Sequence, residues 1–216
     1  ASPQITINNG LEYTGEANVS LDLYATNTPD EMCVSVNSGA SDNWVTYQTT
    51  YDLIIPAGDG EKSVYVQFRN ASGSSVEASD IITLDTTAPG VGGTVAGTPW
   101  TSINDPPEIS FDPAMDSSSG VSANGYAVYW GQNGSSETAT TTNRANAFDP
   151  NPADFTLGSG RYYLRARAQD NVGNWSDWWT ITTYDYDEDT PNIVTDLQST
   201  SHGETIWTND DTIDAE

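Results

Sequence analysis

Residues 162–179 read YYLRARAQDNVGNWSDWW. Apolar and basic side chains alternate from Tyr162 to Ala168, as they do in a β-strand that buries one of its faces. The Asp, Asn and Gly residues that follow are typical of a tight turn. Three tryptophans come directly after that turn. The stretch therefore predicts a strand, a polar turn and the start of a second strand.

The same pattern occurs 100 residues earlier, where VYVQFRNASG (64–73) aligns without a gap on LRARAQDNVG (164–173). Each copy is followed by a strand pattern and by Asp-x-x-x-Pro, at residues 85–89 and 187–191. Proline cannot continue a strand ladder, so each motif ends a unit. We predict one domain at residues 1–89, a second at 90–191, and the start of a third repeat, or an exchanged strand, at 192–216.

The rest of the chain has almost no helical periodicity and alternates with period two between turn signals. The predicted strands are Ile5–Ile7, Val19–Leu23, Met32–Val36, Trp44–Tyr47, Leu53–Ile55, Val64–Phe68, Ile81–Leu84, Glu108–Phe111, Tyr126–Trp130, Thr138–Thr141, Phe155, Arg161–Ala168 and Trp179–Tyr184. About seven short strands per hundred residues is typical of an immunoglobulin-like sandwich. The predicted fold is all-β, with two tandem immunoglobulin-like β-sandwiches and the first strand of a third.

The alternation also predicts which side chains face each core. A slip of one residue would turn every apolar side chain outward, so the register is strongly specified. We expect two separate cores. The residues expected in the first are Val64, Val66 and Phe68, and those expected in the second are Tyr126, Val128, Leu164, Ala166 and Ala168.

Charge and cysteine content exclude several classes of function. The 216 residues carry 6 Lys and Arg against 31 Asp and Glu, a net charge of −25 that repels nucleic acids and anionic membranes. Cys33 is the single cysteine, so neither an internal disulfide nor a cysteine metal cluster can form, and we expect a half-buried thiol. No apolar run approaches the roughly 20 residues of a membrane span, so we expect no membrane insertion.

The polar composition predicts an exported protein. Ser, Thr, Asn and Gly are abundant, and Asn-x-Ser/Thr occurs four times. Such motifs are acceptors for N-glycosylation on surface loops. The predicted glycosylation sites are Asn18, Asn70, Asn133 and Asn174.

A resemblance to known repeats extends this interpretation. Residues 1–89, with ITINNGLEYT, VSLDLYA, MCVSVN, NWVTY and KSVYVQFRNASGSS, resemble the immunoglobulin-like repeats of large bacterial and archaeal cell-surface proteins. Residues 90–191, with MDSSSGVSANGYAVYW, the opening stretch and DEDTP, are similar to the fibronectin III-like repeats found beside them. The resemblance implies an extracellular, non-catalytic stalk, adhesin, surface-layer or fibre component. Its implied partners are other surface-protein chains or copies of itself.

Carboxylates gather where the predicted domains end, and we expect a calcium site there. Calcium takes six to eight oxygen ligands, and a cation would neutralise and stiffen a junction whose like charges repel. The predicted ligands are Asp85, Asp170, Asp177, Asp185, Asp187 and Asp189. The alternative is that turn chemistry alone explains the Asp, Asn and Gly residues after the strand.

The three tryptophans Trp175, Trp178 and Trp179 predict a second kind of site, because an aromatic face can stack on a sugar ring. The function would then be that of a carbohydrate-binding accessory region of a secreted hydrolase, with polysaccharide as the partner. The alternative is that one tryptophan fills the core and another covers its open end.

We expect no enzymatic activity. Asp112 and Asp116 form a carboxylate pair, but acid–base catalysis also needs a pocket and a tuned pKa, at which nothing in the sequence hints. His202 is the single histidine and lies in the incomplete third unit, which argues against a histidine metal site or a Ser-His-Asp triad.

The last residues leave two alternatives open. TIW (205–207) and TI (212–213) read as the opening of a sandwich whose other strands do not follow. A lone strand cannot satisfy its own backbone groups. Either a longer parent protein continues with a third domain, or the strand inserts into a neighbour's sheet and builds a filament by strand donation.

Overall fold

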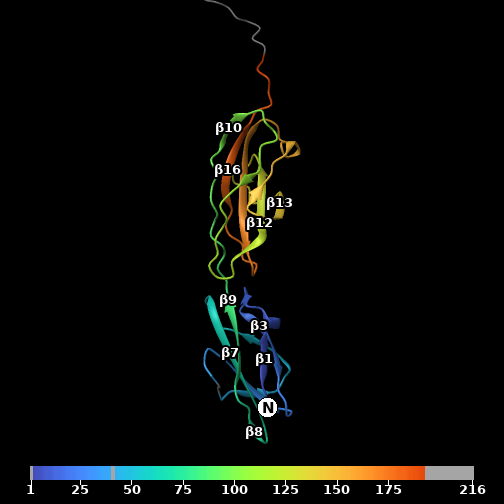
Figure 1. Ribbon diagram of the computed structural model, residues 1–216, viewed down its shortest axis with the longest axis vertical. Helices are drawn as coiled ribbons and strands as arrows, with labels where there is room; N and C mark the ends of the chain where they lie inside the picture. Colours follow the sequence, from blue (N-terminus) through green and yellow to red (C-terminus); the bar gives the residue numbers. More distant parts are fainter. Residues whose placement is uncertain (1, 40–41, 193–216) are drawn as a thin grey trace, which may run out of the picture.

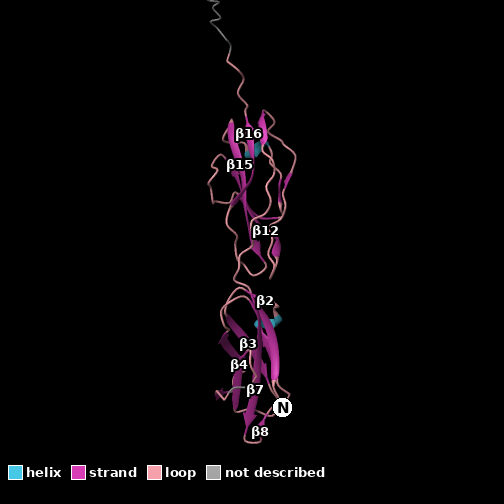
Figure 2. Cartoon of the chain, turned by 90° about the vertical axis from the view of Figure 1, so that its left-hand side faces the viewer, coloured by secondary structure: helices cyan, strands magenta, loops and turns pink. Residues whose placement is uncertain are grey.

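The computed structural model describes residues 2–39 and 42–192, and its architecture is all-β. Two sandwich units follow one another along the chain and lie end to end (Figure 1). Within the described residues, the helical elements are two short 3₁₀ turns, η1 (Asn8–Gly10) and η2 (Pro152–Asp154), and Figure 2 shows strands joined by loops elsewhere. The predicted all-β tandem fold is confirmed, whereas the predicted strand of a third unit lies outside the described residues.

The first unit consists of two sheets. One has the order β1–β3–β6, and the other has the order β2–β9–β7–β4–β5, with β8 beside β7. Their bounds are β1 (Gln4–Ile7), β2 (Tyr13–Thr14), β3 (Asn18–Tyr24), β4 (Glu31–Val36), β5 (Trp44–Thr46), β6 (Thr50–Ile54), β7 (Gly60–Asn70), β8 (Gly73–Ser74) and β9 (Ala78–Leu84). All these pairs are antiparallel except β2 with β9, which is parallel.

The first core lies between these sheets and follows from strict alternation. In β3 the burial pattern changes at every residue, and in β7 Val64, Val66 and Phe68 are at most 1% exposed. The predicted inward side chains of the first unit are therefore in the core. Cys33 is 1% exposed, so the thiol expected to be half-buried is fully buried.

The second unit also has two sheets, one of them small. The larger has the order β10–β16–β15–β12–β13, and the smaller pairs β11 with β14. Their bounds are β10 (Thr98–Thr101), β11 (Ile109–Ser110), β12 (Val121–Gly131), β13 (Thr141–Arg144), β14 (Ala147–Phe148), β15 (Gly160–Asp170) and β16 (Trp179–Tyr186). As in the first unit, the outer strand β10 runs parallel to the last strand, β16.

The second core is rich in aromatic rings. The ring of Trp130 stacks on that of Tyr162 with centroids 5.4 Å apart and meets that of Phe155 edge-on at 5.6 Å. Such pairs stabilise a core beyond their buried area, by roughly 0.5–1.5 kcal/mol each. The predicted inward residues of this unit all lie in this core cluster: Tyr126, Val128, Leu164, Ala166 and Ala168.

Some predicted strands differ from the observed ones, for local reasons. Strands β2, β8 and β14 have two residues each, too few to show alternation, and β10 contains Pro99, which an edge strand tolerates. Phe155, predicted in a strand, caps η2 and fills the core from a loop. The strand predicted at 138–141 begins only at Thr141.

The two cores share no residue, which locates the division between the units. The first core cluster ends with Leu84, and the second begins with Ile109 packed against its edge. The separate cores place the first division only somewhere between residues 84 and 109. The boundaries at residues 89 and 191 therefore stay predictions.

Separate cores should unfold as separate units. Ile82 and Leu164 are each 0% exposed, one in each core. Replacing either by alanine should cost about 2–5 kcal/mol and should lower the unfolding transition of its own unit much more than that of the other. Scanning calorimetry of Ile82→Ala and Leu164→Ala checks this. Equal shifts of one common transition in both variants would contradict it.

Candidate functional site at the joint

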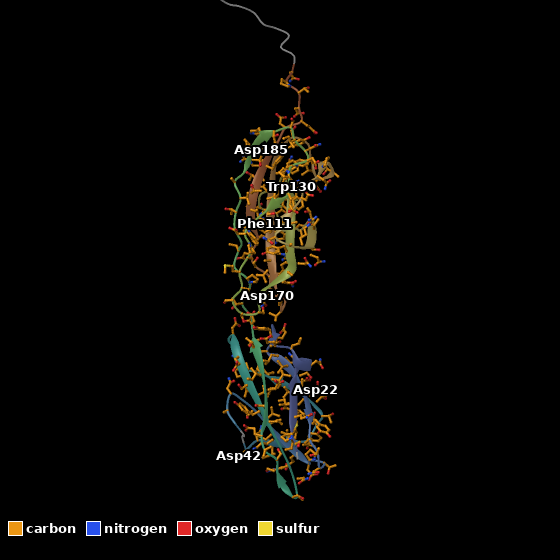
Figure 3. The ribbon with its side chains drawn as sticks, viewed as in Figure 1. Asp22, Asp42, Phe111, Trp130, Asp170 and Asp185 are labelled. Carbon is orange, nitrogen blue, oxygen red and sulfur yellow. The ribbon has the colours of Figure 1, made fainter. Side chains whose placement is uncertain are left out.

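The joint is the place where the end of β9 meets two loops of the second unit. Those loops are residues 112–120, which precede β12, and the turn of residues 170–174, which follows β15. Figure 3 shows Asp170 at the end of the second unit that faces the first, and Asp185 near the opposite end. The chemistry of the joint therefore comes from residues at three strand ends.

The turn after β15 is built on the Asp170 carboxylate. Its Oδ1 accepts backbone N–H bonds from Val172, Gly173 and Asn174 at 3.0, 2.7 and 2.8 Å. Gly173 has a φ of 106°, which glycine adopts at little cost. The Asn174 amide also donates to Asp170 Oδ2, at 2.8 Å. A single carboxylate thus holds the whole turn.

The loop before β12 is built in the same way. Asp116 Oδ1 accepts the N–H groups of Ser118 and Gly120 at 3.0 and 2.8 Å. Asn171 then ties this loop to the turn, since its N–H donates to the Gly120 carbonyl and its amide donates to the Ser119 carbonyl. The two loops of the second unit therefore present one joined surface to the first unit.

Asp85 connects that surface to the first unit. Its own N–H donates to the Thr14 carbonyl within the first unit. Its Oδ2 accepts the Ser119 N–H at 2.9 Å, and its carbonyl accepts the Asn174 amide at 3.0 Å. The last residue of the first sandwich is therefore held by both loops of the second.

Three carboxylates meet at this point. Asp85, Asp116 and Asp170 each offer an oxygen, and these oxygens lie within 4.8 Å of one another. At that separation two full charges repel by about 3–4 kcal/mol if the effective dielectric constant is near 20. Both ion pairs found within the described residues lie elsewhere, at Arg69–Glu31 and Arg161–Asp185. The group offers oxygen ligands of the kind that a hard cation prefers.

The prediction of calcium ligands needs correction. The structure brings Asp85 and Asp170 together but places Asp177 on the exposed surface, outside the group. Asp185, Asp187 and Asp189 lie at or beyond the far end of β16. Because β15 and β16 are antiparallel, the turn that joins them and the end of β16 are at opposite ends of the unit.

Asp185 has a different role. It is 6% exposed and accepts two bonds from the Arg161 guanidinium, at 2.6 and 2.8 Å. These hydrogen bonds from Arg161 hold the pKa of the Asp185 carboxyl below its usual range. The residue is thus half of a two-pronged ion pair between neighbouring strands, not a calcium ligand with Asp85 and Asp170.

Asp116 is the member of the group that the sequence analysis missed as a ligand. In the sequence it reads only as an acid–base partner of Asp112, which is exposed. The pairing of Val121 with Asp170 shows why the two come together, since the loop before β12 must end beside the end of β15. The register of those two strands, had it been predicted, would have identified Asp116.

The tryptophans also need correction, because they form no single three-ring platform. Trp179 is 8% exposed, belongs to the core and donates its indole N–H to the Gly93 carbonyl. Trp175 and Trp178 instead lie over the guanidinium of Arg167, at 4.4 and 5.3 Å. This cation–π stack covers the outer face of β15, opposite the face that carries the core.

The predicted glycosylation sites differ in exposure. Asn18 and Asn133 are exposed, whereas Asn70 and Asn174 are half-buried. The Asn174 amide donates both to Asp85 and to Asp170, and a glycan on that nitrogen would remove one of its two N–H groups. Glycosylation stays a prediction, and the joint geometry favours it at Asn18 and Asn133.

Two surface pockets lie away from the joint. One, of about 290 Å³, is lined by residues 26, 27, 29, 68–70 and 72–75 of the first unit. The other, of about 440 Å³, is more apolar and includes Ile103 and Tyr184. Neither is lined by Asp112 or Asp116.

None of the helices within residues 2–39 and 42–192 has the length and apolar character to span a bilayer.

Comparison with known proteins gives likeness at the level of solved structures only. No family model and no curated protein matches the chain. It is similar to fibronectin(III)-like modules of Clostridium thermocellum CbhA (10% identity, TM-score 0.43, covering 85% of this chain and 94% of that chain). It is also similar to domains A168–A170 from titin, with 16% identity and a TM-score of 0.48, covering 83% of this chain and 66% of that chain. A bacterial ice-binding adhesin is similar with 20% identity and a TM-score of 0.42, covering 86% of this chain and 64% of that chain. The fold described above rests on the strand order and the two cores of this chain.

Proposed function

We propose that this chain is a non-catalytic spacer of an extracellular surface protein, in which two sandwich units are held end to end as one elongated element. The observation that carries the proposal is the shortness of the hinge between the units. A spacer sets the distance between two points only if its joints resist bending. The stiffness of this joint depends on how the chain is anchored on each side of the hinge.

The first unit anchors the chain up to Thr87. Thr86 donates its N–H and its hydroxyl to Asp59 Oδ1, at 2.8 and 2.7 Å. The Thr87 hydroxyl donates to Asp59 Oδ2. These bonds hold the chain against the turn before β7 after it has left β9.

From Gly90 onward the chain is bonded to the second unit, since the Gly90 N–H donates to the Met115 carbonyl at 2.9 Å. Ala88 and Pro89 are the two residues between the anchors. Pro89 is buried, and its ring fixes φ near −65°. The hinge therefore has few torsions left to rotate.

Residues 93–96, beyond the hinge, are also bonded to the second unit. The Gly93 N–H donates to the Asp112 carbonyl at 3.0 Å, and the Val95 N–H donates to the Ile181 carbonyl at 2.8 Å. The Thr182 hydroxyl donates to the Ala96 carbonyl at 3.0 Å. The segment between the sandwiches is thus attached to the second unit along most of its length.

Close contact between the backbones of the two units also limits bending. A Cβ placed on Gly15 would lie 3.0 Å from the Val172 carbonyl oxygen, tighter than ordinary side-chain packing. Backbone of the first unit therefore touches the turn after β15. Together with the bonds to Asp85, this contact gives the joint two separate points of support.

The extracellular setting is proposed from the resemblance and from the surface. The exposed side chains of Asn18 and Asn133 fit glycan attachment, and the excess of acidic residues fits a well-solvated exterior. The stalk, adhesin, surface-layer and fibre roles all require such a spacer. The partners proposed are other surface-protein chains or copies of this one.

The spacer proposal predicts one narrow distribution of shapes in solution. Small-angle X-ray scattering of the intact chain should give an elongated particle that a single end-to-end arrangement of the two units fits. Gly15→Val should broaden the distribution, because its side chain displaces the Val172 backbone. Ser20→Val, on an exposed position of β3, is the matched control and should scatter like the wild type. A broad distribution in the wild type itself would rule out a stiff joint.

The hydrogen bonds from Thr86 and Thr87 to Asp59 form a clasp that holds the chain after β9. The stability of this clasp should depend on pH. Hydrogen bonds from Thr87 and then Thr86 lower the pKa of Asp59 from 3.8 to about 2. A carboxyl whose pKa is lower in the folded state stabilises fully above its unfolded pKa, and this contribution disappears as pH falls through the folded value. The clasp should therefore be intact above about pH 4, half protonated near pH 2 and open below that value.

Carboxyl NMR titration of Asp59 checks this. Thr87→Val removes the hydroxyl donor and should move the midpoint up toward 3.8, whereas Thr50→Val, on a distant exposed strand position, should leave it unchanged. Equal midpoints in the wild type and in Thr87→Val would show that the threonine does not hold the carboxylate.

A further inference from the structure

Two of the carboxylates at the joint are deeply buried. Asp85 is 0% and Asp170 is 2% exposed, and Asp116 is half-buried beside them. Neither ion pair within the described residues involves this group. Buried charges are costly unless they are paired or bind a metal. Backbone N–H groups satisfy part of the oxygen surface, but they bring no full positive charge.

An independent feature of the same place is the Ser119 hydroxyl. Ser119 is 8% exposed, and its buried Oγ has no hydrogen-bond partner among residues 2–39 and 42–192. Its own backbone N–H donates to Asp85 Oδ2 at 2.9 Å, so covalent geometry keeps the hydroxyl within a few ångströms of the group. A buried hydroxyl without a partner is rare and costs free energy. A cation at the joint would use its oxygen lone pairs.

The repeat provides a comparison for the charge on Asp170. Asn70 occupies the same position in the first unit, 100 residues earlier, and also closes the turn after its strand. Its Oδ1 accepts the Ser72 N–H at 2.9 Å, and its amide donates to the Asn27 carbonyl. A neutral amide thus serves at that position in the first unit. The turn alone does not account for the negative charge of Asp170.

We propose that Asp85, Asp116 and Asp170, with the Ser119 hydroxyl, form a divalent-cation site of the calcium class that locks the joint. All four side chains offer oxygen, which selects hard cations, and water would complete the six to eight ligands that calcium takes. Magnesium demands a tighter octahedral arrangement, so calcium is the preferred ion. Asp85 belongs to the first unit and the other residues to the second, so the cation bridges the two.

This inference rests on the proposed spacer function, which it deepens by naming what holds the joint stiff. With the cation bound, the three carboxylates attract a common centre instead of repelling one another. Removal of the cation should leave both sandwiches folded, because no ligand belongs to either hydrophobic core cluster. The expected effect of chelation is therefore loosening of the joint.

The test is calorimetric titration of the chelator-treated chain with calcium chloride. Extracellular modules bind calcium with dissociation constants of about 0.1–1 mM, and we expect a value in or below that range. Asp116→Asn should weaken binding at least tenfold. The variant keeps the Oδ1 acceptor that the loop uses. Both hydrogen bonds that Asp116 makes with described residues go to Oδ1, so the loop should keep its shape.

Asp112→Asn is the matched control, since it removes the same charge from an exposed position four residues away in the same loop. Its affinity should stay within twofold of the wild type. Should Asp116→Asn fail to fold, Ser119→Ala serves in its place, because it removes the hydroxyl and keeps the backbone bond to Asp85. Titration with magnesium chloride should give binding at least tenfold weaker than with calcium.

Two results would overturn the site: no heat of calcium binding to the wild type, or equal affinity in Asp116→Asn and Asp112→Asn. Scattering in calcium and in chelator separates this inference from the spacer proposal. A stiff joint without calcium binding removes the site and keeps the spacer. Calcium binding to a chain whose joint bends freely in both conditions keeps the site and removes the spacer.

Discussion

The two-residue alternation of β7 and β15 sets which side chains each sandwich buries and where its strands end. Each strand sends every second side chain into its core, as Leu164, Ala166 and Ala168 do in the second unit. The intervening residues must then find partners on the outer face. In β15 these are Arg165, whose guanidinium donates to the Ser136 and Trp178 carbonyls, and Arg167, which lies under two indole rings. Once the register is fixed, so is the position at which each strand ends.

The position of the strand ends in turn determines the joint. β15 ends at Asp170, where the turn begins, and the pairing of β12 with β15 brings the loop of Asp116 to the same place. On the other side, β9 ends at Leu84 and presents Asp85 to both loops. No helix or long linker is involved. The joint is therefore a consequence of strand lengths and registers inside the two units, and its chemistry comes from the residues next to those strand ends.

Sequence reasoning predicted what depends on local pattern. The strands around β3, β7 and β15, their inward side chains and the repeat follow from alternation, which neighbouring residues reveal. It failed where a tertiary neighbour decides the outcome. Asp185 reads as one more acidic residue near a domain end, but antiparallel pairing places it beside Arg161 and far from Asp170. Trp179 reads as part of an aromatic surface, but it begins β16 on the face that packs against Phe111 and Tyr126.

The direction of the outer strands explains how such a joint can transmit a load. In both units an early edge strand runs parallel to the last strand, β2 with β9 and β10 with β16. The chain enters the first unit at the end away from the joint and leaves the second at its far end (Figure 1). Tension along the long axis therefore pulls parallel neighbours past one another, so their hydrogen bonds share the load instead of opening one by one. The segment that leads into β10 is bonded to the second unit from Gly90 onward. In the proposed spacer, the joint would lie in series with two sandwiches loaded in shear, and its stiffness would set how closely the whole element follows the direction of pull.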